Sequence, residues 1–468
     1  MKLQDTLSKS EKNIDVSKNL KIYLCGVTVY DESHIGHART IIVFDVLRKY
    51  LESKGSKIEF IQNFTDVDDK IINRANAENT TADKISKKYI ENYFKDFDGL
   101  NVKRATNYPK ATEHIDEIIK FIEKLIKKDI AYATKNGVYF SVSKFPEYGK
   151  LSKKKIDELQ SGARIEIDEQ KKDPLDFAVW KLSDNEPVWD SPWGKGRPGW
   201  HIECSAMSIK YLGENFDIHG GGRDLIFPHH ENEIAQSESC TGVQFAKIWM
   251  HVGMVTINGE KMSKSIGNVK SIKHVLDNWG ANVIRLFCLS GHYSKPIDYS
   301  EELLKENLIK WRQAEICHYE LIHANKENDL ENESIVEKTR TEFDNALEDD
   351  FNTHRALSSF FQLIKETNRL AADEKLGRND AENIKAELKR MRDVLGLYIP
   401  EITKNEKQEI DRLIMDREQH RKEKQFENAD KIRDKLNEMN VELIDHKEKT
   451  IWMRKEKIKA EHQNKIEN

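Results

Sequence analysis

A strand, a helix and a second strand follow one another between residues 22 and 65, and this run constrains the fold more than any other feature of the chain. An apolar run at residues 22–24, ended by Gly26, is typical of a short buried strand. Apolar residues then recur at helical spacing from about residue 35 to 51, and residues 58–62 resume a period of two. This order predicts a right-handed parallel β-α-β unit, and therefore a doubly wound α/β sheet.

The later segments predict how the rest of the chain is divided. Residues 71–185 mix helical and strand-like patterns, and strand-like runs return at residues 216–219 and 248–255. After residue 300 the pattern is helical only. We therefore expect a Rossmann-like sheet domain with an inserted connective domain, followed by an all-α bundle and a C-terminal region. The predicted boundaries are 1–70 with 186–300, then 71–185, 301–400 and 401–468.

Two apolar stripes illustrate the helical half. Both are most simply interpreted as bundle cores. The first stripe consists of Ile384, Leu388, Met391 and Leu395. The second stripe consists of Phe426, Ala429, Ile432 and Leu436. The lysine-rich tail from Arg454 onward has few apolar residues, and we expect it to fray.

Charge and cysteine content limit the class of protein. The 76 basic and 81 acidic residues nearly cancel, so bulk charge does not indicate a nucleic-acid partner and any basic surface must be local. Five scattered cysteines, an odd number, favour reduced thiols over a disulfide framework. The apolar runs are too short to span a bilayer, and the first residues do not resemble a secretory signal. We expect a soluble cytoplasmic protein without a membrane partner.

The tetrapeptide His34-Ile35-Gly36-His37 lies where the first predicted strand gives way to the first helix. A helix N-terminus attracts phosphate because its backbone N–H groups are unpaired and its dipole is positive there. His34 and His37 add donors on the same side, and Gly36 leaves room for a nucleotide. The motif predicts a phosphate site, with two surface histidines at an ordinary helix start as the alternative.

A second motif, Lys261-Met262-Ser263-Lys264-Ser265, follows a turn at Gly259 and is expected to form a loop. Its two lysines can stabilise the charge that grows as pyrophosphate leaves. A solvated basic loop is the alternative when the lysines are taken alone. With both motifs present, the chain resembles a class I aminoacyl-tRNA synthetase, and no Walker or dinucleotide-binding fingerprint competes for the phosphate role.

Four further residues have metal-ligand chemistry. His229 and Glu233 are spaced i, i+4 after Pro228, which puts them on one face of a predicted helix. Cys25 ends the first strand, and Cys204 lies in a second short segment. Two thiolates, an imidazole and a carboxylate suit zinc. The remaining cysteines, Cys240, Cys288 and Cys317, are expected to be small buried hydrophobes.

The segments around these residues resemble cysteinyl-tRNA synthetase. The resemblance covers nearly the whole chain and is strongest from Lys21 to about Tyr299. Its clearest stretches are residues 25–30, 63–70, 172–181, 199–207 and 227–236. It implies a cysteine–tRNA ligase that uses ATP with Mg²⁺, carries one Zn²⁺, forms cysteinyl-adenylate and esterifies the terminal ribose of its tRNA. It also implies a monomer.

The resemblance further implies a role for each motif residue. The groups expected to stabilise the phosphates are His34, His37, Lys261 and Lys264. Gly222 and Asp224 are expected near the ATP ribose, although a glycine run after a strand is often only a turn. The cysteine pocket is expected to include Gly26, Thr65 and Trp200, with an ordinary core Trp and strand-end Thr as the alternative.

We interpret the implied zinc as the element that selects the amino acid. Cysteine and serine differ by one atom, and an apolar pocket separates such near-isosteres only about a hundredfold. A metal with an open position binds a thiolate and rejects a neutral alcohol. A closed structural zinc is the alternative. Against it, Cys25 stands nine residues before His34 and is expected in the same crevice.

The helical half resembles the anticodon-reading bundle of that family, notably at residues 344–353. The chain has His354 where the family usually has proline, and it lacks the usual glycine between Asp445 and Trp452, so the residues that contact bases stay open. Two other functions are alternatives. A ligase joining activated cysteine to a small amine would not need the helical half, and a non-catalytic regulator would not need both lysines.

Overall fold

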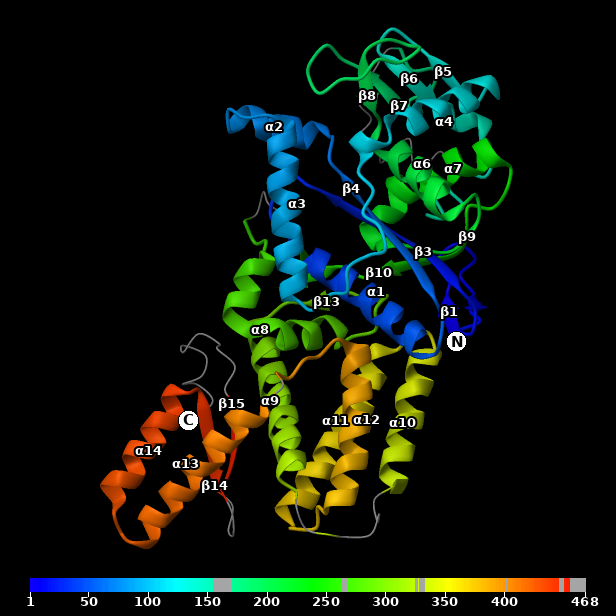
Figure 1. The fold of residues 1–468 in the computed structure, drawn as a ribbon. Helices are drawn as coiled ribbons and strands as arrows, with labels where there is room; N and C mark the ends of the chain where they lie inside the picture. Colours follow the sequence, from blue (N-terminus) through cyan, green and yellow to red (C-terminus); the bar gives the residue numbers. More distant parts are fainter. Residues whose placement is uncertain are drawn as a thin grey trace. The chain divides into compact units, whose positions relative to one another are not determined.

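The computed structural model describes the chain except residues 155–169, 263–266, 325–326, 328–332, 401, 446–449 and 455–468. The chain divides into two compact units (Figure 1). The sheet unit comprises Met1–Ile272, Gly291–Tyr299 and Glu348–Asn352. The helical unit comprises Lys273–Ser290, Ser300–Leu347 and Thr353–Asn468.

A parallel sheet of order β10-β9-β3-β4 forms the centre of the sheet unit. Its strands are β3 (Leu20–Thr28), β4 (Ile58–Thr65), β9 (Phe216–Gly222) and β10 (Ala246–Val252). Helix α1 (Ile35–Ser53) connects β3 to β4, which run in parallel register from Leu20↔Ile58 to Thr28↔Thr65. The predicted β-α-β unit and doubly wound fold are confirmed.

Two adjacent glycines of β9 let other elements approach both faces of this sheet. A Cβ on Gly220 would lie 2.0 Å from the ring of Phe44 on α1, and a Cβ on Gly221 would lie 2.7 Å from the ring of His230. Successive residues of a strand face opposite sides. Helix α1 therefore covers one face, and the segment carrying His230 covers the other.

The segment between β4 and β9 forms helices and an antiparallel sheet of order β5-β6-β7-β8 (Figure 1). Its elements are α2 (Asp69–Ala77), α3 (Ala82–Gly99), α4 (Ile115–Lys127), β5 (Ala131–Ala133), β6 (Gly137–Phe140), β7 (Phe177–Leu182), β8 (Gly196–Pro198) and α6 (Trp200–Leu212). Asp68 caps α2 by accepting a hydrogen bond from the Lys70 N–H (2.9 Å). Helix α6 packs on β3 and β4 and brings Cys204 to the sheet.

The remaining elements of this unit are β1 (Lys2–Gln4), β2 (Glu11–Asn13), α7 (Glu231–Thr241), β11 (Val255–Ile257), β12 (Glu260–Lys261) and β13 (Ile297–Asp298). Helix α8 (Ile272–Leu289) belongs to the helical unit from Lys273 onward. A π-helical turn, Ile226–His230, precedes α7. Lys261 was predicted on a loop but ends β12, because the turn at Gly259 closes an antiparallel hairpin in which Thr256 pairs with Lys261.

Buried Arg39 ties α1 to the base of that hairpin. Its guanidinium donates to the carbonyls of Gly253 (2.9 Å) and Met254 (3.0 Å), and to those of His292 (3.2 Å) and Lys295 (2.6 Å). Arg39 therefore links α1, which begins at the histidine motif, to the residues that lead into the hairpin of Lys261.

The helical unit contains α9 (Glu301–His323), α10 (Glu333–Glu348, whose last residue belongs to the sheet unit), α11 (Thr353–Ala372), α12 (Arg378–Leu395), α13 (Lys404–Lys422), α14 (Phe426–Glu438), β14 (Val441–Asp445) and β15 (Thr450–Arg454). The stripe from Ile384 to Leu395 is buried, as predicted. The prediction that the second stripe is buried is wrong at Phe426, whose side chain is 61% exposed. Phe426 begins α14, whereas the core against this helix forms at its other end, where Leu436 joins a cluster with Ile410 and Trp452.

His354 lies in the first turn of α11, a position that suits proline, and its Nδ1–H donates to the Ser290 carbonyl (2.5 Å). The segment between Asp445 and Thr450 and the tail after Arg454 lie outside the described residues. Within the described part of the chain, none of the helices combines the length and the apolar character needed to cross a bilayer.

Candidate active site

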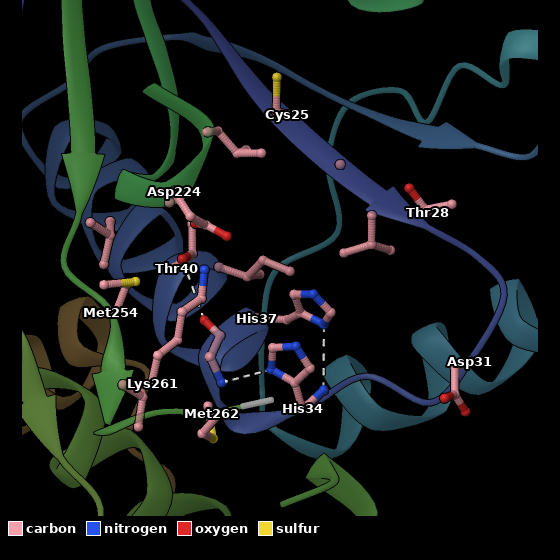
Figure 2. A pocket seen from close by; sticks show the side chains of 18 of the residues that line it. Cys25, Thr28, Asp31, His34, His37, Thr40, Asp224, Met254, Lys261 and Met262 are labelled. Atoms are coloured by element: carbon pink, nitrogen blue, oxygen red, sulfur yellow. Dashed lines mark hydrogen bonds between the residues drawn. The ribbon is translucent and has the colours of Figure 1, made fainter. Parts of the chain in front are cut away.

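A cavity of about 340 Å³ opens in the sheet unit where β3, β9 and β10 end (Figure 2). Eight of the predicted site residues line it: Cys25, Gly26, His34, His37, Trp200, Gly222, Asp224 and Lys261. In Figure 2, Cys25 extends from β3, the imidazoles of His34 and His37 lie at the start of α1, and Lys261 enters from β12. The carboxyl edge of a parallel sheet is where such folds bind ligands.

The two histidines cap α1 reciprocally. His34 Nδ1 accepts a hydrogen bond from the Gly36 N–H (3.2 Å), and His37 Nδ1 accepts one from the His34 N–H (3.4 Å), with the two rings stacked at 3.7 Å. Because each Nδ1 accepts, each neutral ring carries its proton on Nε2, which is the form that donates to a phosphate oxygen. A Cβ on Gly36 would lie 3.0 Å from the His34 ring, so the glycine makes this stacked arrangement possible.

Gly222, Asp224 and Lys261 also line the cavity, while Lys264 lies outside the described residues. Thr40, Tyr30 and Lys70 also line the cavity, and sequence reasoning assigned them no role. The Lys70 ammonium lies 5.5 Å from the centre of the Tyr30 ring. The one signal for Lys70 was its place in the family-like stretch of residues 63–70.

A buried cluster of thiols, imidazoles and a carboxylate lies beside Cys25. Cys25 Sγ is 3.8 Å from Cys204 Sγ and 3.3 Å from Glu233 Oε1, and His229 Nε2 is 2.9 Å from the same Glu233 oxygen. The Nδ1 atoms of His229 and His201 are 2.9 Å apart, which turns His229 Nε2 toward Glu233. The structure therefore brings the four predicted metal ligands together, although they come from β3, α6, the turn before α7 and α7 itself.

This donor set fits a divalent metal ion. Two thiolates on tetrahedral zinc, with Zn–S bonds of about 2.3 Å, would lie about 3.8 Å apart. The two thiols of the cluster already have this separation. Glu233 Oε2 is buried without a hydrogen-bond partner among the described residues, with His219 Nε2 3.3 Å away. A buried carboxylate needs an opposite charge, which a metal ion supplies.

His230 is a rival for one ligand position. The ligand atoms of Cys25, His229, His230 and Glu233 all lie within 4.8 Å of one another, and this group of four does not include Cys204. Sequence reasoning missed His230, and the only signal for it was its place directly after His229. Two more buried histidines, His219 and His251, were also missed, because each lies on a strand that reads as ordinary core.

Burial controls protonation in the metal-free cluster. It raises the pKa of Cys25 and of Glu233 well above their usual values, and it lowers the pKa of His219 and His230 well below theirs. The hydrogen bond from Cys25 lowers the pKa of Cys204 to about 7. The free cluster therefore favours neutral side chains with one thiolate, and metal binding must release protons.

Of the three residues predicted to form the cysteine pocket, Trp200 and Gly26 line the cavity and Thr65 does not. Trp200 begins α6, is 37% exposed, lines the cavity and stacks on the His229 ring at 4.3 Å. The Gly26 N–H donates to Asn63 Oδ1 (2.8 Å), and a Cβ there would lie 1.6 Å from the Asn63 carbonyl oxygen, so only glycine fits. Thr65 is buried at the end of β4 and is not among the residues that line the cavity.

The chain is similar to known proteins over nearly its whole length. A family model described as "tRNA synthetases class I (C) catalytic domain" matches residues 11–308, and a DALR domain model matches residues 342–399. A cysteine–tRNA ligase of Thermodesulfovibrio yellowstonii is 52% identical over 465 residues, covering 93% of this chain and 95% of that protein. One of Caldicellulosiruptor saccharolyticus is 45% identical, covering 95% and 98%.

Solved structures of other synthetases share the fold. Methionyl-tRNA synthetase of Mycobacterium tuberculosis, in complex with methionyl-adenylate, has a TM-score of 0.60 at 14% identity, covering 81% of this chain and 89% of that one. LeuRS of Agrobacterium radiobacter K84, in a ternary complex with tRNA and LeuAMS, has a TM-score of 0.61 at 10% identity, covering 81% and 84%. The two family models and the near-full-length relatives establish that the chain belongs to the cysteine–tRNA ligases, a family of class I aminoacyl-tRNA synthetases.

Proposed function

We propose that this chain activates L-cysteine with ATP and transfers the cysteinyl group to the 3′-terminal ribose of its tRNA. The cysteine carboxylate attacks the α-phosphate of ATP, which forms cysteinyl-adenylate and releases pyrophosphate. A ribose hydroxyl then attacks the activated carbonyl, and AMP leaves. The observation that carries the proposal is that one cavity is lined by Cys25 of the thiol cluster and by both histidines of the phosphate motif.

The phosphate end of the cavity supports a role in charge stabilisation. His34, His37 and Lys261 offer donors to the phosphates of ATP, which we expect to arrive with Mg²⁺, and Lys264 is assigned the same role by its motif. Gly222 and Asp224, which also line the cavity, are assigned to the ribose. Because the reacting atoms belong to the substrates, the protein contributes alignment and electrostatic stabilisation, not covalent chemistry.

At the amino-acid end, we propose a zinc site formed by Cys25, Cys204, His229 and Glu233. Cys204 is preferred to His230 because the two sulfurs have the spacing of a tetrahedral site, while both ring nitrogens of His230 already have partners. Bound there, zinc would take the substrate thiolate as a fifth ligand and would reject a neutral alcohol. Cys25 belongs to the cluster and also lines the cavity, which favours an ion within reach of the substrate over a closed structural ion.

We further infer that the helical unit binds the anticodon region of the tRNA. The DALR domain match at residues 342–399, which falls largely in this unit, supports this assignment. The cognate amino acid then meets the acceptor end at the cavity of the sheet unit.

Cysteine-dependent exchange of pyrophosphate into ATP, followed by transfer to a tRNA transcript, tests the proposal. We expect exchange with cysteine, far weaker exchange with serine, and transfer to tRNA for cysteine. Exchange without transfer would instead indicate ligation to another acceptor, such as a small amine. No exchange with any amino acid would indicate a non-catalytic role. Equal exchange with serine in the zinc-loaded protein would contradict selection by the metal.

A further inference from the structure

A row of hydrogen-bonded side chains runs from Cys25 to the N-terminal segment of the chain. His230 Nε2 lies 3.3 Å from Cys25 Sγ, His230 Nδ1 lies 2.8 Å from His251 Nε2, and His251 Nδ1 lies 2.8 Å from Thr6 Oγ1. Both imidazoles are buried. The row thus joins β3, the turn before α7, β10 and the segment after β1.

The state of Cys25 determines the direction of every hydrogen bond in this row. A metal-bound cysteine is a thiolate, so its sulfur can only accept, and the His230 Nε2–H must donate to it. His230 Nδ1 then accepts from the His251 Nε2–H, and His251 Nδ1 accepts from the Thr6 hydroxyl. The reverse direction would need a proton on the Cys25 sulfur.

We propose that Thr6 and His251 are positioning residues that hold His230 as an Nε2–H donor to the Cys25 thiolate. This inference rests on the proposed zinc site. The row gives His230 a role distinct from metal ligation: it orients and stabilises one thiolate ligand and leaves the fourth metal position to Cys204. Hydrogen bonds of this kind to metal ligands set ligand orientation and metal affinity.

A second imidazole near Cys25, that of His219, lacks, within the described part of the chain, the hydrogen bond at Nδ1 that the row gives to His230. His219 Nε2 lies 3.5 Å from Cys25 Sγ, but its buried Nδ1 has no hydrogen-bond partner among the described residues. The tautomer of His219 therefore has no support at Nδ1 from these residues, whereas two successive hydrogen bonds beyond Nδ1 support that of His230.

The N-terminal segment is built to hold Thr6 in place. Buried Asp5 accepts a hydrogen bond from the Trp249 N–H (2.9 Å) and pairs with Lys12 (2.8 Å), and the Thr6 N–H donates to the Trp249 carbonyl (2.9 Å). These contacts fasten the segment to β10, the strand that carries His251. The antiparallel hairpin of β1 and β2, which lies outside both signature motifs, thereby contacts the row that leads to Cys25.

The test uses the full-length protein with four substitutions. Thr6→Val removes the hydroxyl at nearly constant shape, Thr6→Ser restores it, and His251→Phe removes the relay nitrogens while keeping a ring. Ser8→Ala is the matched control, because its hydroxyl bonds Asp5 and Ser10 in the same segment but no histidine. Zinc affinity is measured by chelator competition, the thiolate-to-metal charge-transfer band by Co²⁺ substitution, and folding by thermal melting.

We expect Thr6→Val and His251→Phe to weaken zinc binding about 10- to 100-fold and to shift the Co²⁺ band. Thr6→Ser and Ser8→Ala should match the wild type in both. Wild-type zinc affinity and an unchanged Co²⁺ band in Thr6→Val and His251→Phe would overturn the inference while leaving the zinc site intact. Loss of zinc in Ser8→Ala equal to that in Thr6→Val would also overturn it, since hairpin stability would then be the cause. A wild-type protein that binds no zinc yet activates cysteine would overturn the zinc site and this inference together.

Discussion

The two ends of the cavity are built in opposite ways. At the amino-acid end, Cys204, His229 and Glu233 are buried and in direct contact with one another or with Cys25. At the phosphate end, two partly exposed histidines cap a helix, and exposed Lys261 ends a two-residue strand. One end is enclosed by the protein, and the other is open to solvent.

This difference follows from what each end has to recognise. Telling a thiol from a hydroxyl requires preformed, desolvated donors, because the substrates differ by a single atom. A triphosphate already carries several charges, so N–H and ammonium groups at an accessible helix start are sufficient to bind it. Substitutions at the buried end should therefore reduce metal and amino-acid binding, and substitutions at the open end should reduce the rate.

The substitution Cys204→Ser should have the largest effect. Serine is a poor zinc ligand, so we expect zinc affinity to fall more than ~100-fold, beyond the loss typical of an outer contact, with cysteine affinity falling in parallel. Metal content and the KM for cysteine in pyrophosphate exchange measure the two losses. Cys240→Ser, a buried cysteine outside the cluster, is the control. Zinc loss without any change in cysteine binding would make the ion structural and would break the comparison.

The substitution Lys261→Ala should affect the opposite end alone. Loss of one donor to the developing charge should lower kcat for exchange about 100-fold, while zinc content and the KM for cysteine stay near wild type. Lys264→Ala is expected to behave in the same way. Lys18→Ala, which removes an exposed lysine that does not line the cavity, should leave all three quantities unchanged. A rise in the KM for cysteine equal to the fall in kcat would show that the two ends are not separate.

Local patterns made much of this architecture predictable. The β3–α1–β4 unit and the phosphate motif depend on residues close in sequence, where periodicity and helix-start chemistry carry the information. Cys25 and Cys204 are 179 positions apart, and they were found through family-like segments and not through any local rule.

The contacts that escaped prediction are tertiary. The hydrogen bond between Thr6 and His251 joins residues 245 positions apart, and neither residue stands in a recognisable pattern. The burial predicted for Phe426 is wrong because periodicity identifies the apolar face of a helix but not how much of its length is covered by other elements. The loop predicted at Lys261 is wrong because a turn signal such as Gly259 does not reveal whether strands flank the turn.

Replacement of Trp200 probes the boundary between the two ends. Its ring stacks on His229 and lines the cavity, so Trp200→Ala should lose an aromatic contact of about 0.5–1.5 kcal/mol, which is about a 2- to 10-fold rise in the KM for cysteine. Trp200→Phe keeps a ring and should stay closer to wild type. An effect on the KM for ATP alone would assign Trp200 to the open end.

The smallest effect is a pH dependence of the metal-free protein that only the buried end should show. The hydrogen bond from Cys25 lowers the pKa of Cys204 from 9.0 to about 7, so the folded state favours the thiolate. A lowered pKa contributes stability that is fully present above the unfolded value and is lost as pH falls through about 7. Ultraviolet thiolate absorbance should therefore rise in a step near pH 7 that is absent in Cys204→Ser and moves to higher pH in Cys25→Ala. Thermal stability relative to Cys204→Ser should increase between pH 7 and 9, and a flat difference over that range would show that the two thiols do not share a proton in the folded state.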